Sequence, residues 1–502
     1  MITRRRVLKA SALAPWALWA KPIGALAGNG ELVRLLVDTP REALLDALAG
    51  RIQAGLAPQQ LLGALAVATC RAVSPYPNVG FKYHAVMMLR SVEQSVVAMS
   101  TERAWLPLLW TADYFKAASA QQDRIEPWSL RPLPEGPRSG GTPRPAALVE
   151  ALASWDAERA DLATADLVAT GRTRAALQTL MLHAARDFRA IGHKPIAAAN
   201  AHRLVAAVGE TVAAPLARSL ALAVQNAEGD ANPARYEHDA DRDWQANQAM
   251  AARLPPDWQS GRDDIAAART LLQELRTASS EQAARAAVDL LADNVSAHTV
   301  WEAVMMFAAE LMLRRNGIVA LHASTTANAM HYCYLMADED HARRLQLLQA
   351  VVFMARFRSM VERDSRTRDR RIDAITPAPA DGLDEIFRTL GPSRIDAVGQ
   401  ALGWLEAGGD AAALGNRARW YATLKNRGTH DIKFTEAMLE NYRWLRLTWR
   451  DALLAASLIY ANASDDRDDQ LVVRAQTLLG LDQPRSFPGN TGMRAGPTQS
   501  SV

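Results

Sequence analysis

The stretch that decides the fold class is PREALLDALAGRIQAGLAPQQLLGALAVATCRAV, residues 40–73. Apolar residues recur in it every three or four positions, which is the period of an amphipathic α-helix. Glycine and proline separate the periodic segments, as they do where one helix ends and the next begins. The stretch therefore predicts consecutive helices rather than strands.

The same period continues over most of the remaining chain. It is clear in TRAALQTLMLHAARDF (173–188), VWEAVMMFAAELMLRR (300–315) and HARRLQLLQAVVFMARFRSMVERD (341–364). Runs of valine, isoleucine and threonine with alternating polarity, which are typical of strands, are nearly absent. We therefore expect an all-α protein, either a multi-helix bundle or an α-solenoid-like array of antiparallel helix pairs. No repeated consensus with a period of ~30–47 residues supports a true repeat.

Proline and glycine also indicate how the chain is organised. The 502 residues are 49% hydrophobic and 22% charged, a composition that can bury a large interior. The segment EPWSLRPLPEGPRSGGTPRPA, 126–146, has a proline and glycine content that no helix tolerates. We expect it to link an N-terminal helical subdomain, 28–125, to a main helical domain, 147–482. Residues 483–502 lack an apolar period and are expected to be disordered.

The first 27 residues have the features of an export signal. TRRRVLK (3–9) is basic, the next eleven residues are mostly apolar, and ALAG (25–28) provides small residues for cleavage near Ala27. The arginines followed by an apolar pair and a lysine resemble the twin-arginine signal. We therefore expect the twin-arginine export machinery as a partner and a periplasmic location. The apolar run is too short to span a bilayer, so no stable membrane span is expected after cleavage.

Charge and cysteine content exclude further classes. The signal segment holds five of the 57 basic residues and no acid, which leaves 52 basic against 54 acidic residues. Without a net basic character, nucleic acid is not an expected partner. Cys70 and Cys333 both lie in apolar helical contexts. Two buried free thiols are therefore expected in preference to a disulfide.

Five of the ten histidines are candidate metal ligands. Each is flanked by apolar residues at or near an expected helix boundary: His84, His193, His322, His331 and His430. An imidazole removed from water needs a partner, and a shared metal ion provides one for several rings at once. The alternative is that each ring is an ordinary hydrogen-bonded core residue.

Three polar residues are expected to support these ligands. Asp187 follows His183 by four residues, Asn328 precedes His331 by three, and Asp431 directly follows His430. A carboxylate or amide that bonds to a ligating imidazole fixes its orientation. The pair His298 and Glu302 has the same four-residue spacing, which suits an ordinary surface pair equally well.

The segment LHASTTANAMHY, 321–332, allows two arrangements. On one unbroken helix His322 and His331 lie about 900° apart, on opposite faces, and cannot bind one ion together. If Ser324 or Thr325 caps a new helix, His322 lies in the preceding loop and can fold back over it. The sequence leaves both open.

An aromatic segment and several missing motifs complete the prediction of the site. RAWLPLLWTADYFKAASAQQ, 103–122, can line an apolar substrate pocket through Trp105, Trp110 and Tyr114, or it can simply pack in the core. No glycine-rich nucleotide motif and no serine-hydrolase elbow occurs. No Cys-x-x-Cys-His occurs either, which excludes haem attached in the ordinary c-type manner.

Three motifs resemble the questin-oxidase-like family. They are IGHKPIAAANAHRL, GIVALHASTTANAMHYCYL and THDIKFTEAMLENY, which together lie between residues 80 and 460. The resemblance implies oxidation of polycyclic aromatic ketones, with NADPH as a possible cofactor. It implies catalytic roles for His193, His322 and Thr325, with His331 and His430 as further site residues.

Together these observations predict an exported oxidoreductase, oxygenase-like, with a histidine-rich site acting on a small organic substrate. Iron or haem is the first expectation for its cofactor. The alternative is a helical binding or scaffold protein of the periplasm without catalytic activity.

Overall fold

The computed structural model describes residues 29–75, 84–133, 144–227, 232–235, 237–446 and 449–481. Within these ranges the chain forms helices joined by loops and no sheet, and the one β-bridge, between Arg262 and Val295, is isolated. The prediction of an all-α protein is confirmed. The expected signal segment and the expected disordered tail both lie outside the described residues.

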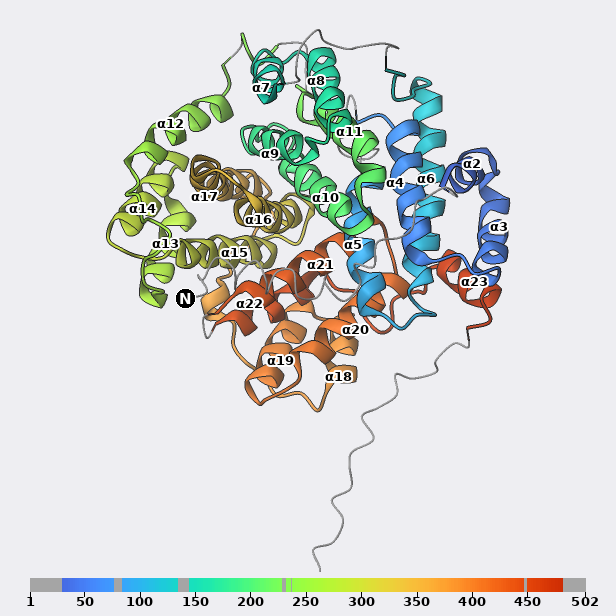
Figure 1. Cartoon of the computed structure of the whole chain (residues 1–502). Helices are drawn as coiled ribbons and strands as arrows, with labels where there is room; N and C mark the ends of the chain where they lie inside the picture. Colours follow the sequence, from blue (N-terminus) through green and yellow to red (C-terminus); the bar gives the residue numbers. More distant parts are fainter. Residues whose placement is uncertain are drawn as a thin grey trace, which may run out of the picture.

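The helices are short to medium in length and fill the described chain (Figure 1). In chain order they are α2 (Asn29–Asp38), α3 (Arg41–Gln53), α4 (Pro58–Ala72), α5 (His84–Ala98), α6 (Trp105–Ile125), α7 (Pro145–Ala153), α8 (Ala157–Ala169), α9 (Thr173–Ala184), α10 (His193–Val208), α11 (Ala213–Val224), α12 (Asp239–Arg253), α13 (Ile265–Thr277), α14 (Ser280–Ala292), α15 (Ala297–Arg314), α16 (Ile318–Met336), α17 (Asp340–Glu362), α18 (Leu383–Thr389), α19 (Arg394–Glu406), α20 (Ala411–Leu424), α21 (Thr429–Trp444), α22 (Arg450–Ser457) and α23 (Gln470–Leu478). Three 3₁₀ turns lie at Glu210–Val212, Ile372–Ala374 and Leu458–Tyr460.

Several helices begin at a residue whose side chain caps the first turn. The Asp264 carboxylate accepts hydrogen bonds from the first amides of α13, and Ser279 forms a capping box with Gln282 at the start of α14. Each such cap satisfies amides that have no partner inside the helix. The outer helices therefore begin at positions that local sequence specifies.

Four helices form the centre of the molecule, and we call α5, α10, α16 and α21 the central helices. Each packs against two of the others, so that the four close into a ring. Roughly a hundred residues separate consecutive central helices, and the helices between them pack around this ring (Figure 1).

The central helices run in the same general direction. Their first turns meet at the four histidines described below, and residues further along meet as well. Ser95 of α5 donates to Glu436 of α21, and Arg203 of α10 pairs with Glu440 of α21. Two antiparallel helices that touched at their first turns would diverge along this direction. In each central helix, the side chains three, seven and ten residues after the histidine therefore face one shared interior.

Two apolar clusters surround this centre. One joins α2–α11 with α23, and the other joins α12–α15 with α17–α20 and α22. Helices α6 and α7, which flank the expected linker at 126–146, belong to the same cluster. The first cluster thus continues along the chain to α11, and α12 is the next helix to belong to the second cluster. Helix α23 packs on α3 and α6, which brings the two ends of the described chain together (Figure 1).

Two smaller expectations concern thiols and membranes. Cys70 and Cys333 are buried free thiols, as predicted, and burial raises the pKa of each to about 12. No helix in the described ranges combines the length and the apolar character that crossing a membrane requires.

Candidate metal centre

Four imidazoles from the four central helices meet at the start of those helices. His84 and His193 are the first residues of α5 and α10, His430 is the second of α21, and His322 is the fifth of α16. The ring centroids of His193 and His322 lie 4.4 Å apart, and those of His84 and His430 lie 4.6 Å apart. The structure thus brings together four of the five histidines singled out in the sequence.

The ring nitrogens of three of them converge. Nε2 of His193 lies 3.0 Å from Nε2 of His84 and 3.0 Å from Nε2 of His322. Nδ1 of His193 is 2.6 Å from the Ala190 carbonyl, and Nδ1 of His322 is 2.7 Å from the Ile318 carbonyl. A carbonyl only accepts, so these Nδ1 atoms carry the hydrogen and each neutral ring presents a lone pair at Nε2.

This arrangement leaves two lone pairs facing each other across 3.0 Å, a repulsive contact unless a cation lies beside them. Two imidazole nitrogens bound to one metal ion lie ~2.9–4.2 Å apart when each metal–nitrogen bond is ~2.1 Å. The separations from His193 to His84 and to His322 lie at the short end of that range, as expected for neighbouring ligands.

His84, His322 and His430 complete the donor set. Each offers one ring nitrogen such that the three atoms lie within 4.8 Å of one another. Nε2 of His430 is buried and has no hydrogen-bond partner among the described residues. A buried polar atom without a partner costs free energy, and a metal ion at this position would satisfy it. His84, His322 and His430 therefore fit a single ion, and His193 lies beside two of them.

The site keeps its imidazoles neutral. Burial lowers the pKa of His193 to about 4 and that of His430 to about 2, with the charge of Lys433 as the second cause. Burial also holds the pKa values of His84 and His322 well below the usual value. The neutral ring is the form that binds a metal.

A strained turn places His193 at the first position of α10. Ile191 has φ +44° and Gly192 has φ +79°, the left-handed region that β-branched residues rarely occupy. A Cβ on Gly192 would lie 1.9 Å from Oγ1 of Thr326, so only glycine lets α10 approach α16 this closely. Backbone strain of this kind persists where surrounding structure enforces it, and here it orients a site residue.

A buried ion pair anchors the same turn. The Lys194 ammonium is fully buried and donates to the Asp187 carboxylate and to the Asn226 carbonyl. Asp187 also accepts from Arg189. The cations of Lys194 and Arg189 lower the pKa of Asp187 despite its burial. Asp187 thus supports His193 through the backbone, and it does not bond to an imidazole.

The helix break considered for residues 321–332 does not exist. Helix α16 is continuous from Ile318 to Met336 with Gly317 at its N-cap, so the alternative in which Ser324 or Thr325 caps a new helix is wrong. Instead, the Ser324 hydroxyl donates to the Ala308 carbonyl of α15, and the Thr325 hydroxyl donates to the Leu321 carbonyl within α16. The expectation for an unbroken helix applies, because His322 and His331 are nine residues apart and face opposite sides.

His331 therefore lies in a different environment. Its ring packs against Trp301, Trp444 and Tyr334, with centroid separations of 5.0, 5.3 and 6.2 Å. It is not among the imidazoles that converge. Both histidines of α16 were predicted to be metal ligands, and the structure places only His322 among the converging imidazoles.

The other expected supporting residues also bond elsewhere. Asp431 accepts from Arg427 and Asn462, and Asn328 donates to Asn441 and accepts from Arg203. The expected pairing of His183 with Asp187 is not formed, because α9 ends at Ala184.

Two further histidines, His183 and His298, bond to side chains away from the converging imidazoles. Nε2 of His183 lies 3.0 Å from the Gln225 side-chain amide. The pair of His298 and Glu302 is formed at 3.0 Å, within a single helix. Neither pair belongs to the four-histidine site.

The three expected substrate-pocket residues all lie on α6. Trp105 is buried, and Trp110 stacks on Tyr114 while its indole nitrogen donates to Asp469. Tyr114 forms a hydrogen bond with Thr429, and the Thr429 hydroxyl lies 3.3 Å from Nδ1 of His84. Tyr114 is thus connected to the histidine site through one intervening hydroxyl group.

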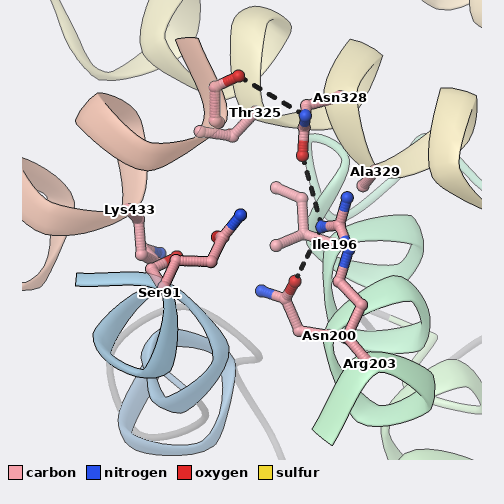
Figure 2. Close-up of a pocket in the computed structure, with 10 residues that line it drawn as sticks. Ser91, Ile196, Asn200, Arg203, Thr325, Asn328, Ala329 and Lys433 are labelled. Carbon is pink, nitrogen blue, oxygen red and sulfur yellow. Dashed lines mark hydrogen bonds between the residues drawn. The ribbon is translucent and has the colours of Figure 1, made fainter. Parts of the chain in front are cut away.

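A small cavity lies one to three helical turns beyond the histidines. It measures about 20 Å³ and is lined from all four central helices, including Thr325, Asn200, Arg203 and Lys433 (Figure 2). Lys433 was not predicted as a site residue. The available signal was its position, since it follows His430 by three residues and so shares its helical face.

Haem does not fit this site. Two axial nitrogens on one haem iron lie ~4 Å apart on opposite faces of the ring, and the porphyrin must extend between them. Here the imidazole rings contact one another directly, and the adjoining cavity is about 20 Å³. The expectation of haem is therefore not supported, whereas a single ion fits.

Comparisons with family models, curated proteins and solved structures found no match for this chain. The resemblance to the questin-oxidase-like family accordingly stays a prediction from three short motifs.

Proposed function

We propose that the protein is an oxidoreductase that acts at one transition-metal ion held by His84, His193, His322 and His430. The observation that carries this proposal is the convergence of Nε2 atoms at 3.0 Å with the Nδ1 hydrogens of two rings turned to carbonyls. Such an arrangement directs lone pairs to a common point, as the ligands of a metal ion do.

A shared proton explains the contact less well. A hydrogen on Nε2 of His193 or His322 would make that ring an imidazolium, because its Nδ1 already carries one. The charge would be buried among three other imidazoles and near Lys433, which opposes it. A metal ion instead binds several of the rings at once, which offsets its own desolvation.

The donor set narrows the choice of ion. Four imidazole nitrogens suit iron, copper or zinc, and none of the four residues is a carboxylate of the kind that magnesium or calcium prefers. Iron and copper change oxidation state, and iron also agrees with the family resemblance. When bound, such an ion supplies one-electron or O₂ chemistry. The chain holds it, keeps the ligands neutral and excludes bulk water by burial.

The substrate we propose is a small organic molecule, as the resemblance implies. Thr325 follows His322 by one turn and lines the cavity next to the histidines. Tyr114 reaches the site through Thr429 and has a pKa raised to about 12 by burial, so it stays protonated and can donate a hydrogen bond. These two residues are the groups we assign to substrate contact or proton transfer.

Export remains part of this proposal. The basic and apolar pattern of residues 3–28 supports a twin-arginine signal, and that route carries proteins already folded. A metal inserted in the cytoplasm would then accompany the folded chain to the periplasm. Fractionation of cells that express the full chain and a chain with Arg4, Arg5 and Arg6 replaced by lysine tests the address.

Metal analysis of the purified protein tests the function. We expect about one equivalent of iron or copper per chain, with an absorption band that disappears on chelation. The matched control is the chain in which His193 and His322 are both replaced by alanine, which should purify without the ion. A folded wild-type protein that binds no iron, copper or zinc would contradict the proposal and favour the alternative of a helical binding protein.

A further inference from the structure

The cavity beside the histidines is lined by a lysine that no carboxylate among the described residues neutralises. Lys433 is 4% exposed and lines the cavity, and within the described residues its ammonium group makes no hydrogen bond or ion pair. Burial alone lowers its pKa to about 7, without any carboxylate acting in the opposite direction. An isolated buried ammonium is costly, so a site that retains one requires a reason.

The other charges in the same interior are balanced. Arg203 pairs with Glu440 at 2.7 Å, and Arg419 pairs with Glu436 at 2.5 Å. Arg90 pairs with Glu93 along α5. Each buried guanidinium therefore has its own carboxylate, and these carboxylates are not available to Lys433. When Lys433 is protonated, the interior of the central helices holds one positive charge in excess.

Further hydrogen-bond donors face the cavity from α5. Ser91 is 6% exposed, and neither its hydroxyl group nor the Gln94 amide has a hydrogen-bond partner among the described residues. Ser91 lines the cavity together with Lys433 (Figure 2). Gln94 lines the same cavity. An ammonium, a hydroxyl and an amide directed into one space are the donors that an anion's oxygens accept.

The size of the cavity limits what can enter. A water-sized body needs roughly 10–15 Å³ in this measure, and the cavity offers about 20 Å³. It therefore takes a ligand of two or three heavy atoms. A benzoate-sized molecule is larger than this space.

We propose that Lys433, Ser91 and Gln94 form a binding site for a small monovalent anion of the carboxylate type, such as formate. The ammonium of Lys433 pairs with the anion, and Ser91 and Gln94 donate to its oxygens. The site lies one helical turn from His430, on the same face of α21. It requires only these residues, and it exists whether or not the histidines hold a metal ion.

Thermal unfolding in the presence of formate tests this site. The full chain is titrated with sodium formate at constant ionic strength, before and after dialysis against a chelator. A ligand that binds only the folded state raises the midpoint as its concentration rises through Kd. We expect a saturable rise with formate in both preparations and none with benzoate, which is too large.

Two variants and a control assign the effect to residues. Lys433→Met should weaken formate binding at least ~10-fold, and Ser91→Ala should weaken it a few-fold. Lys433→Met should also raise the midpoint in formate-free buffer, because it removes an unpaired buried charge. The control is Lys425→Met, which removes a buried lysine that pairs with Asp468 at 2.8 Å outside the cavity. It should leave formate binding unchanged.

Several results would overturn the inference. They are the absence of a formate effect in the wild type, an equal effect of benzoate, or an effect that survives in Lys433→Met. An effect seen only before chelation would place the anion on the metal and not on Lys433. A failure of the metal proposal alone would leave the formate effect intact, so the two proposals fail separately.

Discussion

His322 and His331 belong to the same helix and are both almost fully buried, at 1% and 3% exposed. His322 faces three imidazoles, one from each of the other central helices, and lies 3.0 Å from Nε2 of His193. His331 faces two indoles and a phenol ring. Burial lowers the pKa of both.

The comparison shows that burial and a lowered pKa do not distinguish a ligand from a core residue. The two rings share a helix and an apolar sequence context, and they differ only in the side chains that the fold brings to them. The aromatic rings around His331 pack against it but provide no nitrogen lone pair that could bind a metal ion. The imidazole nitrogens around His322 can bind one ion together with it.

The largest expected difference is in metal content. His322→Ala removes a donor atom and should reduce metal affinity at least ~100-fold, whereas His331→Phe keeps the aromatic packing and should purify with the wild-type amount. Metal analysis of both proteins measures this. Equal metal content in the two variants would remove the distinction drawn between the rings.

The next effect concerns the turn that presents His193 to His322. Asp187→Asn leaves the buried ammonium of Lys194 without its carboxylate and should lower the free energy of unfolding by about 3–5 kcal/mol. Asp338→Asn breaks an exposed pair with Arg174 and should cost less than about 1 kcal/mol. Urea unfolding of the two variants gives both values. Similar losses would mean that the pair near His193 does not anchor the turn.

A smaller loss is expected at the glycine of that turn. Gly192→Ala adds a Cβ beside Thr326 in a left-handed conformation and should cost about 2–4 kcal/mol. Gly171→Ala is the matched control, because its φ of +73° is similar and no atom lies near the added Cβ. It should lower the free energy of unfolding by only about 1 kcal/mol, which is the cost of placing an alanine in the left-handed conformation without a clash. Equal values would show that α10 can move away from α16 without cost.

The smallest effect is a pH dependence at His331. Burial lowers its pKa to about 3 in the fold, against 6.5 for an ordinary imidazole. Between these values the unfolded chain takes up a proton that the folded chain does not, so stability falls as pH falls below 6.5. Between pH 6.5 and 5.5, the free energy of unfolding of His331→Phe should therefore fall by about 1 kcal/mol less than that of the wild type. Identical pH profiles would show that His331 becomes protonated within the fold.

Local sequence determined the helices of this protein and several of their ends. The three- to four-residue period of 40–73 and the caps at Asp264 and Ser279 act over a few residues, so they can be interpreted without a structure. The same holds for the candidate histidines, because a polar ring in an apolar helix is visible in the sequence.

Tertiary structure alone decided which of those histidines meet. His84, His193, His322 and His430 are about 110–130 residues apart along the chain, and only the ring of central helices brings their first turns together. The unpaired charge of Lys433 was equally hidden, because a lysine has a partner or lacks one according to residues far away in the chain. Helical periodicity is a property of neighbouring residues, whereas the site depends on distances between helices.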